Sequence, residues 1–312
     1  MVTAPDRLLR RLEWRLGRRL DGRLHGGYRT VWHGAGIDFT DLRPYTPEDD
    51  VRHIDWNVTA RLDEPFVRQY TEERELTAWL VVDRSASMRF GRATGEKPAT
   101  GAKPATGAKP AGKESVATEL AVVLARLVSL NGNRVGAILY DNLAHQVIPP
   151  RPGRDQVLRI TRELIRPAAS VGSGTTTDLA AMLRLTAAIA SRRRSLVFLV
   201  SDFIAQPGWE RPLTLLTHRH EVVVIRVVDP AELDLPDVGV ILVEDAETGE
   251  QLLVDTSDPL LRGRLATQVG AREEALGDGM RRAGVDPHRI TTDQDLLAAF
   301  ISMVHRSGWR RR

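Results

Sequence analysis

The central half of the chain alternates strand patterns with helix patterns, and this alternation constrains the fold more than any other feature. Continuous apolar runs predict strands over residues 76–82, 134–140, 195–200 and 221–228. Apolar residues at helical spacing predict helices over residues 115–130, 154–166, 178–191 and 209–219. Strands that are apolar throughout are typical of a parallel sheet covered by helices on both faces. We therefore expect an α/β fold with a doubly wound, mostly parallel sheet.

The segments on either side of this alternation predict three parts of the chain. Residues 1–75 should hold an N-terminal amphipathic helix over 6–20, followed by a small β-rich segment. Residues 76–256 should form the α/β domain and end in a hairpin over 240–255, with Thr248-Gly249 as its turn. Residues 257–312 should add helices over 259–284 and 294–306 that close the domain.

One segment, Gly95 to Lys113, breaks the pattern. It repeats the hexapeptide G-x-K-P-A-T nearly three times and holds all four lysines of the chain. Proline and glycine at such short intervals oppose both helix and strand, so we expect a disordered insertion that folding does not need. Its end comes close to a P-loop pattern, but Glu114 stands where that pattern requires a magnesium-binding hydroxyl. We therefore reject nucleotide binding at this segment.

Composition excludes several classes of protein. Without cysteine, the chain can form neither disulfides nor thiolate metal sites. A net charge of only +3 gives no reason to expect nucleic-acid binding. Arginines interrupt the N-terminal apolar pattern, which argues against a signal peptide, and no apolar run approaches the ~20 residues that span a bilayer. These features predict a cytoplasmic protein without an integral membrane segment.

Oxygen-bearing side chains follow several predicted strands or open a predicted helix. Asp83, Ser85 and Ser87 come directly after the strand at 76–82, and Asp202 follows the strand at 195–200. A loop rich in Gly, Ser and Thr, residues 172–177, opens the helix at 178–191. Because ligands of open parallel sheets bind at the carboxyl ends of the strands, these groups should meet at one edge. Hydroxyl and carboxylate oxygens suit Mg²⁺ or Mn²⁺, so the pattern predicts a cation site there.

The same residues resemble the metal-ion-dependent adhesion site of von Willebrand factor A domains. The resemblance rests on Asp83-x-Ser85-x-Ser87, a threonine in the second loop, and Asp202. Thr177 fits best, because T-x-x-A-x-x-L runs from Thr177 to Leu183, although the neighbouring Thr175 and Thr176 leave the register open. The resemblance implies a module that binds a partner through the partner's acidic residue, rather than an enzyme.

A longer motif, from Gly36 to Leu62, resembles the domain of unknown function 58 family. The matching residues are Arg43, Tyr45, Asp49, Asp50, Arg52, Ile54, Asp55, Trp56, Ala60 and Arg61. Glu48 replaces a glycine that the family usually has. The resemblance implies a bacterial or archaeal protein that acts with a MoxR-type AAA+ ATPase as a co-chaperone or assembly factor. From the residues themselves, the three aspartates predict a structural network with Arg43, Arg52 and Arg61, or alternatively a second metal site.

Two functions of different classes remain. In the first, the cation site docks the acidic residue of a partner or client protein, and the chain carries no catalytic residue. In the second, the same ion polarises a phosphoryl oxygen, as in a metal-dependent phosphoesterase. An enzyme would need a general base beside Asp83, and the sequence places no histidine near any of the three loops. We therefore expect a binding module.

Overall fold

The structure is a computed structural model that describes most of the chain. The described residues are 37–47, 49–62, 64–72, 76–91, 112–130, 132–141, 145–167, 177–190, 193–235, 237–244 and 250–306. Several sequence predictions lie outside them: the helix at 6–20, most of the Pro/Lys-rich repeat, the hairpin turn at 248–249, and the alternative ligands Thr175 and Thr176.

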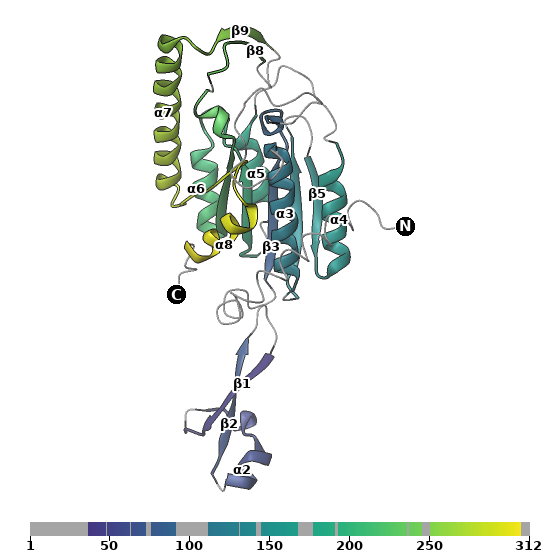
Figure 1. The fold of residues 1–312 in the computed structure, drawn as a ribbon. Helices are drawn as coiled ribbons and strands as arrows, with labels where there is room; N and C mark the ends of the chain where they lie inside the picture. Colours follow the sequence, from purple (N-terminus) through teal and green to yellow (C-terminus); the bar gives the residue numbers. More distant parts are fainter. Residues whose placement is uncertain are drawn as a thin grey trace.

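A six-stranded sheet with the order β10-β7-β6-β3-β4-β5 forms the centre of the fold (Figure 1). Its strands are β3 (Thr77–Asp83), β4 (Arg134–Tyr140), β5 (His145–Arg151), β6 (Leu196–Ser201), β7 (Glu221–Val228) and β10 (His288–Thr291). All neighbouring strands are parallel except β4 and β5, which are antiparallel. The expected α/β architecture with a mostly parallel sheet is therefore confirmed.

Helices cover both faces of the sheet, as their apolar residues predicted. The helices are α3 (Lys113–Leu130), α4 (Arg154–Ile165), α5 (Leu179–Ile189), α6 (Glu210–Arg219), α7 (Pro259–Arg282) and α8 (Leu296–Arg306). One core packs α3, α4 and α8 against Leu80 and its neighbours of the same face. The other core packs α5, α6 and α7 against Trp79 and Val81, which point the opposite way. Such two-sided coverage is compatible with a doubly wound fold.

The sheet has two strands that the sequence did not predict. β5 carries Pro149 and Pro150, which remove backbone donors, and it tolerates them because it is an edge strand. β10 has four residues and lies between α7 and α8, in the segment for which only helices were expected. The four predicted strands agree with β3, β4, β6 and β7 to within a residue or two at each end.

Two smaller sheets complete the described residues. β1 (Ile37–Pro44) and β2 (Phe66–Glu72) form an antiparallel pair, with the short helices η2 (Val51–His53) and α2 (Trp56–Leu62) between them. β8 (Val240–Glu244) and β9 (Gln251–Asp255) form the predicted hairpin. Across the part of the chain that the structure describes, no helix combines the length and apolar character needed to cross a membrane.

Candidate metal centre

Asp83 ends β3 with a carboxylate that is buried and accepts a hydrogen bond at each oxygen. Oδ1 accepts a hydrogen bond from the backbone N–H of Ser85 at 2.9 Å, which turns the chain into the short helix η3 (Ser87–Arg89). Oδ2 accepts a hydrogen bond from the hydroxyl of Ser201 at 2.7 Å, at the end of β6. Neither oxygen contacts a basic group within the described residues. The Asp83 carboxylate is thus held in place without a counter-charge.

The other predicted ligands lie at the same edge of the sheet. The hydroxyl oxygens of Ser85 and Ser87 are 3.1 Å apart, and both residues are buried. Thr177 is buried too, directly before Asp178, whose side chain caps the N-terminus of α5. Burial raises the pKa of Tyr140 at the end of β4, and the negative charges of Asp178 and Asp83 raise it further. Asp178, at the start of α5, therefore lies near Tyr140, the residue of β4 that pairs with Asp83 at the end of β3.

Asp202 is fixed through both its side chain and its backbone carbonyl. Its Oδ1 accepts the backbone N–H of Ile204 at 2.9 Å. Its carbonyl oxygen accepts Nε–H of Arg226 at 3.1 Å, and the Arg226 guanidinium forks onto Glu273 of α7 at 2.6 and 2.5 Å. The next residue, Phe203, has a φ of 59°, a left-handed conformation uncommon outside glycine. This turn keeps the Asp202 carboxylate at the sheet edge.

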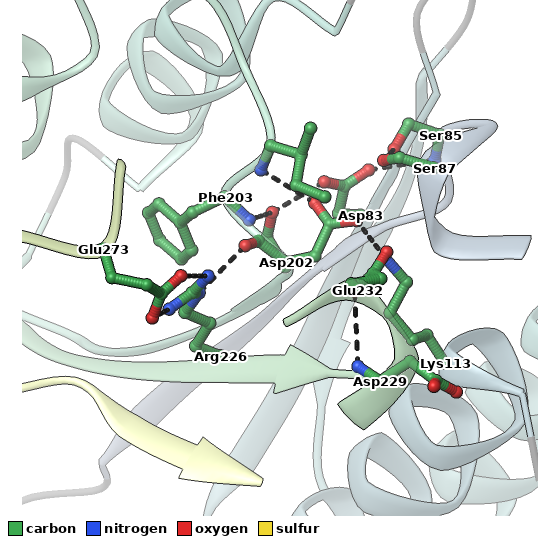
Figure 2. Close-up of polar contacts among 12 residues, drawn as sticks. Asp83, Ser85, Ser87, Lys113, Asp202, Phe203, Arg226, Asp229, Glu232 and Glu273 are labelled. Carbon is green, nitrogen blue, oxygen red and sulfur yellow. Dashed lines mark hydrogen bonds and ion pairs between the residues drawn. The ribbon is translucent and has the colours of Figure 1, made fainter. Parts of the chain in front are cut away.

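Lys113 is a member of the site that the sequence reasoning missed. Its Nζ lies 2.7 Å from Oδ2 of Asp202 and 2.5 Å from Oε1 of Glu232, and its side chain has no exposed surface (Figure 2). The predicted disordered range of 95–113 is therefore wrong at its end, because Lys113 is the first residue of α3. A cation is unfavourable at a helix N-terminus, so the two carboxylates must offset this cost. The available signal was a lysine at the junction between the repeat and a helix.

Glu232 owes its position to the short helix η4 (Pro230–Glu232). Its Oε2 accepts the backbone N–H of Asp229 at 3.3 Å, and Asp229 accepts the N–H of Ala231 at 3.0 Å, which makes a capping box. The second oxygen of Asp229 accepts the hydroxyl of Thr292 at 2.9 Å. Burial raises the pKa of Glu232, and the charge of Lys113 opposes that shift. The capping box thus aims a carboxylate at Lys113.

The charges of the centre do not balance. Of its three carboxylates, those of Asp202 and Glu232 contact the ammonium of Lys113, and that of Asp83 contacts no cation among the described residues. Burial raises the pKa of Asp83 to about 6, and the charge of Asp202 raises it as well. When all three carboxylates are ionised, two negative charges remain in excess. A divalent cation supplies the charge that would neutralise them.

Acidic side chains alone do not make the centre. Within the described ranges, no group of three or more His, Cys, Asp or Glu side chains is placed to hold a metal ion. An ion at this edge would therefore depend on the hydroxyls of Ser85, Ser87 and Thr177 beside the Asp83 carboxylate. These are hard oxygen donors, which suit Mg²⁺ and Mn²⁺.

Comparison with known proteins places the chain in a family. A model described as Protein of unknown function DUF58 matches residues 41–275. The chain belongs to the DUF58 family. An uncharacterized protein of Mycobacterium bovis, Mb1516, is 36% identical over 299 residues, covering 95% of this chain and 87% of that protein. Rv1480 of Mycobacterium tuberculosis, also uncharacterized, matches with the same identity and coverage.

Solved structures resemble this DUF58 chain more distantly. A conserved hypothetical protein, BatB from Bacteroides thetaiotaomicron, superimposes with a TM-score of 0.45 and 13% identity, covering 75% of this chain and all of that one. An aerotolerance-related membrane protein from Bacteroides fragilis superimposes with a TM-score of 0.46 and 12% identity, at the same coverage. An uncharacterized membrane spanning protein from Vibrio fischeri superimposes with a TM-score of 0.26 and 15% identity, covering 73% of this chain and 96% of that one.

These neighbours correct one prediction. Two of the three are described as membrane proteins, which contradicts the cytoplasmic location expected from the sequence. The sequence reasoning relied on the absence of a long apolar run, and membrane association does not require every part of a protein to cross the bilayer. Because the TM-scores lie below 0.5, we draw no conclusion about activity from these structures.

In the DUF58 signature segment, the acidic residues have separate structural roles. Arg43 forms a two-pronged ion pair with Asp49, which also accepts the N–H and hydroxyl of Thr46. The hydrogen bonds that Asp49 accepts from Arg43 and Thr46 hold its pKa well below its usual range, and the charge of Arg43 adds to this effect. Asp50 instead caps η2 by accepting the N–H of Arg52 at 3.0 Å. Of the predicted network, the structure thus shows the pair of Arg43 with Asp49.

The remaining signature residues fix the short helix or face solvent. Asp55 is buried and accepts the N–H groups of Asn57 and Val58 at the start of α2. The backbone N–H of Tyr45 donates to Pro65 at 2.7 Å. The side chains of Arg52, Trp56 and Arg61 are exposed, Trp56 to 68%. Since the three aspartates bond to an arginine and to backbone amides, they do not converge on a second metal site.

Proposed function

We propose that this DUF58 protein is a divalent-cation-dependent protein-interaction module with a von Willebrand factor A-like fold. Mg²⁺ or Mn²⁺ would be held by Asp83, Ser85, Ser87 and Thr177, with Asp202 close by. The observation that carries the proposal is the Asp83 carboxylate, which is buried, oriented by two hydrogen bonds and not matched by any described cation. Burying a carboxylate in this way is costly unless something neutralises it.

The surrounding residues determine how an ion would behave. Lys113 already holds one oxygen of Asp202, and the N–H of Ile204 holds the other, so Asp202 contributes mainly its charge. The hydroxyls of Ser85 and Ser87 are neutral ligands and leave the ion electrophilic. A bound Mg²⁺ or Mn²⁺ keeps several waters, one of which a carboxylate from outside can displace. The residues of this chain thus suit recognition of an acidic side chain on a partner.

The partner we propose is a MoxR-type AAA+ ATPase, a client protein, or both. The support for the ATPase is the signature segment, which follows the DUF58 pattern at Arg43, Asp49 and Asp55 and at the exposed Trp56. In this proposal the module acts as a co-chaperone or assembly factor, and the cation site binds an acidic residue of the partner.

Calorimetric titration with MgCl₂ and MnCl₂ tests the metal site. The wild-type protein should bind one ion weakly, and Asp83→Ala should abolish the heat of binding while the circular dichroism spectrum stays unchanged. Glu274→Ala, which removes an exposed carboxylate from α7, is the matched control and should bind like wild type. Pull-down of a MoxR-type ATPase should then require the ion and fail in EDTA. If Asp83→Ala pulls down the ATPase as wild type does, the proposal is wrong.

The alternative function, a metal-dependent phosphoesterase, makes a different prediction. Such an enzyme should hydrolyse p-nitrophenyl phosphate in MnCl₂ and lose that activity in Asp83→Ala. The binding module should show no turnover above that of the control buffer. Turnover that Asp83→Ala removes would favour the enzyme over the module.

A further inference from the structure

The chain changes character after β7, between Arg226 and Arg262. Residues 227–261 contain no Lys, Arg or His, although about one residue in seven of the whole chain is Lys or Arg. The same stretch contains ten acidic residues: Asp229, Glu232, Asp234, Asp237, Glu244, Asp245, Glu247, Glu250, Asp255 and Asp258. Lys113 holds Glu232, and Thr292 contacts Asp229. The described acids after Asp229 and Glu232 are solvent-exposed, and of these Asp234 pairs with Arg262, so the rest of the segment presents a negative surface.

Large apolar side chains stand exposed within this acidic segment. Leu242 of β8 lies directly opposite Leu253 of β9, so both project from the same face of the hairpin, and they are 61% and 70% exposed. Val240, next on that face, is exposed as well. On the same face, Asp255 pairs with Val240 at one end of this apolar row, and Glu244 pairs with Gln251 at the other end. The hairpin face is thus apolar along its middle and acidic at both ends.

The hairpin has too little apolar burial of its own to account for this arrangement. A two-stranded sheet is marginally stable in water unless another element covers it. Ile241 and Val254, on the opposite face, are only half-buried, and Leu252 beside them is exposed. Leu260, in the first turn of α7, is exposed too. A surface of this kind typically marks a site of interaction.

The hairpin also lies close to the candidate metal centre in the chain. It follows η4, whose Glu232 contacts Lys113. In Figure 1, the hairpin lies beyond the end of the sheet at which β7 finishes and the chain enters η4. A partner that engages one of the two would thus meet the other at the same end of the molecule.

The charge of the surface decides between occupants. An anionic membrane would be repelled by acidic residues at both ends of the apolar row. A second copy of the hairpin would bring the same negative charges face to face. We propose that the β8–β9 hairpin docks a basic amphipathic segment of a different protein, with apolar side chains on Leu242 and Leu253 and with Lys or Arg beside Glu244 and Asp255. Complementary charge of this kind gives both specificity and fast association.

Fluorescence anisotropy with a labelled synthetic peptide tests this docking. The probe has Leu and Lys at helical spacing, and its control has Glu in place of Lys. Measured on the full chain in EDTA, so that the metal centre plays no part, the Leu/Lys peptide should bind at least tenfold tighter than the Leu/Glu peptide. The double variant Leu242→Ser, Leu253→Ser should weaken binding at least tenfold. Leu215→Ser, which removes an exposed leucine from α6, should not.

Charge reversal provides an independent arm. The double variant Glu244→Lys, Asp255→Lys should reverse the preference, so that the Leu/Glu peptide binds tighter. The proposal is overturned if Leu215→Ser weakens binding as much as the hairpin variant does. Binding of anionic vesicles that is lost in the Leu242→Ser, Leu253→Ser variant would overturn it in favour of a membrane. Peptide binding that occurs only after residues 1–21 are deleted would overturn it in favour of the chain's own N-terminal segment.

Discussion

Lys113→Met removes the ammonium that contacts Asp202 and Glu232 and keeps a side chain of similar length. The variant leaves Asp202 and Glu232 close together without a cation, since Nζ lies 2.7 and 2.5 Å from them. Breaking a buried ion pair by removing one partner costs about 3–5 kcal/mol. We expect the free energy of unfolding in EDTA to fall by about 4 kcal/mol. At about 2–4 °C per kcal/mol, the melting temperature should fall by roughly 10 °C.

The same variant should bind metal more tightly, which a purely structural lysine would not explain. Removing a positive charge from beside the ion, at an effective dielectric constant of about 20, is worth several kcal/mol. A tenfold gain in affinity for Mn²⁺, about 1.4 kcal/mol, is therefore a lower bound. Excess MnCl₂ should restore more of the melting temperature in Lys113→Met than it adds to wild type, because the ion binds the folded state.

Thermal denaturation in EDTA and in MnCl₂, with calorimetry of the metal, measures both effects. Glu232→Gln is the matched control of opposite sign, because it removes a negative charge. Lys113 then has Asp202 as its remaining ion-pair partner within the centre. Its metal affinity should fall. If the free energy of unfolding of Lys113→Met in EDTA falls by less than about 1 kcal/mol, or if the variant binds Mn²⁺ no more tightly than wild type, Lys113 is not the counter-charge of the centre.

Three further predictions follow from single features of the fold. The pKa of Asp83 is raised from 3.8 to about 6, so without metal this group lowers stability as the pH rises between those values. By urea denaturation in EDTA, Asp83→Asn should match wild type below about pH 4 and exceed it by up to roughly 3 kcal/mol above about pH 6; equal stability at high pH would contradict this. Deleting residues 95–111 should leave the melting temperature nearly unchanged, whereas a deletion that also takes Lys113 should lower it as Lys113→Met does. Gly136→Ala should cost about 1–3 kcal/mol in urea denaturation, because the added methyl would lie 2.9 Å from both the backbone carbonyl oxygen of Ile148 and the ring of Trp79, and wild-type stability would show that both can move away.

The parts of the fold that were predictable are those with a strong local pattern. The apolar runs of β6 and β7 are buried on both faces, so they carry a signal without ambiguity. β5 was missed because its Pro149 and Pro150 are turn residues in most settings, and its edge position is visible only once the sheet is assembled. β10 was missed because four residues are too few to establish a pattern.

Some residues of the candidate metal centre were likewise predictable from the sequence, and others were not. Asp83 and Asp202 each end a predicted strand, and topology alone brings such residues to one edge. The contact of Lys113 with Glu232 could not be predicted, because 119 positions separate the two residues and no motif links them. The local hydrogen bonds of two signature aspartates were not predicted either, for another reason. Asp50 and Asp55 satisfy nearby backbone amides, and such local hydrogen bonds compete with the ion pairs that charge alone suggests.

The late position of β10 in the chain affects how the protein can fold during synthesis. β7 ends at Val228, and the strand that covers its open side begins at His288, about 60 residues later. At a synthesis rate of about 5–20 residues per second, β7 waits roughly 3 to 12 s for its neighbour. During that time its unpaired amide and carbonyl groups can pair with another nascent chain. A ribosome that stalls between these two strands would therefore release an aggregation-prone fragment, although Asp83, Lys113 and Asp202 would already have been made.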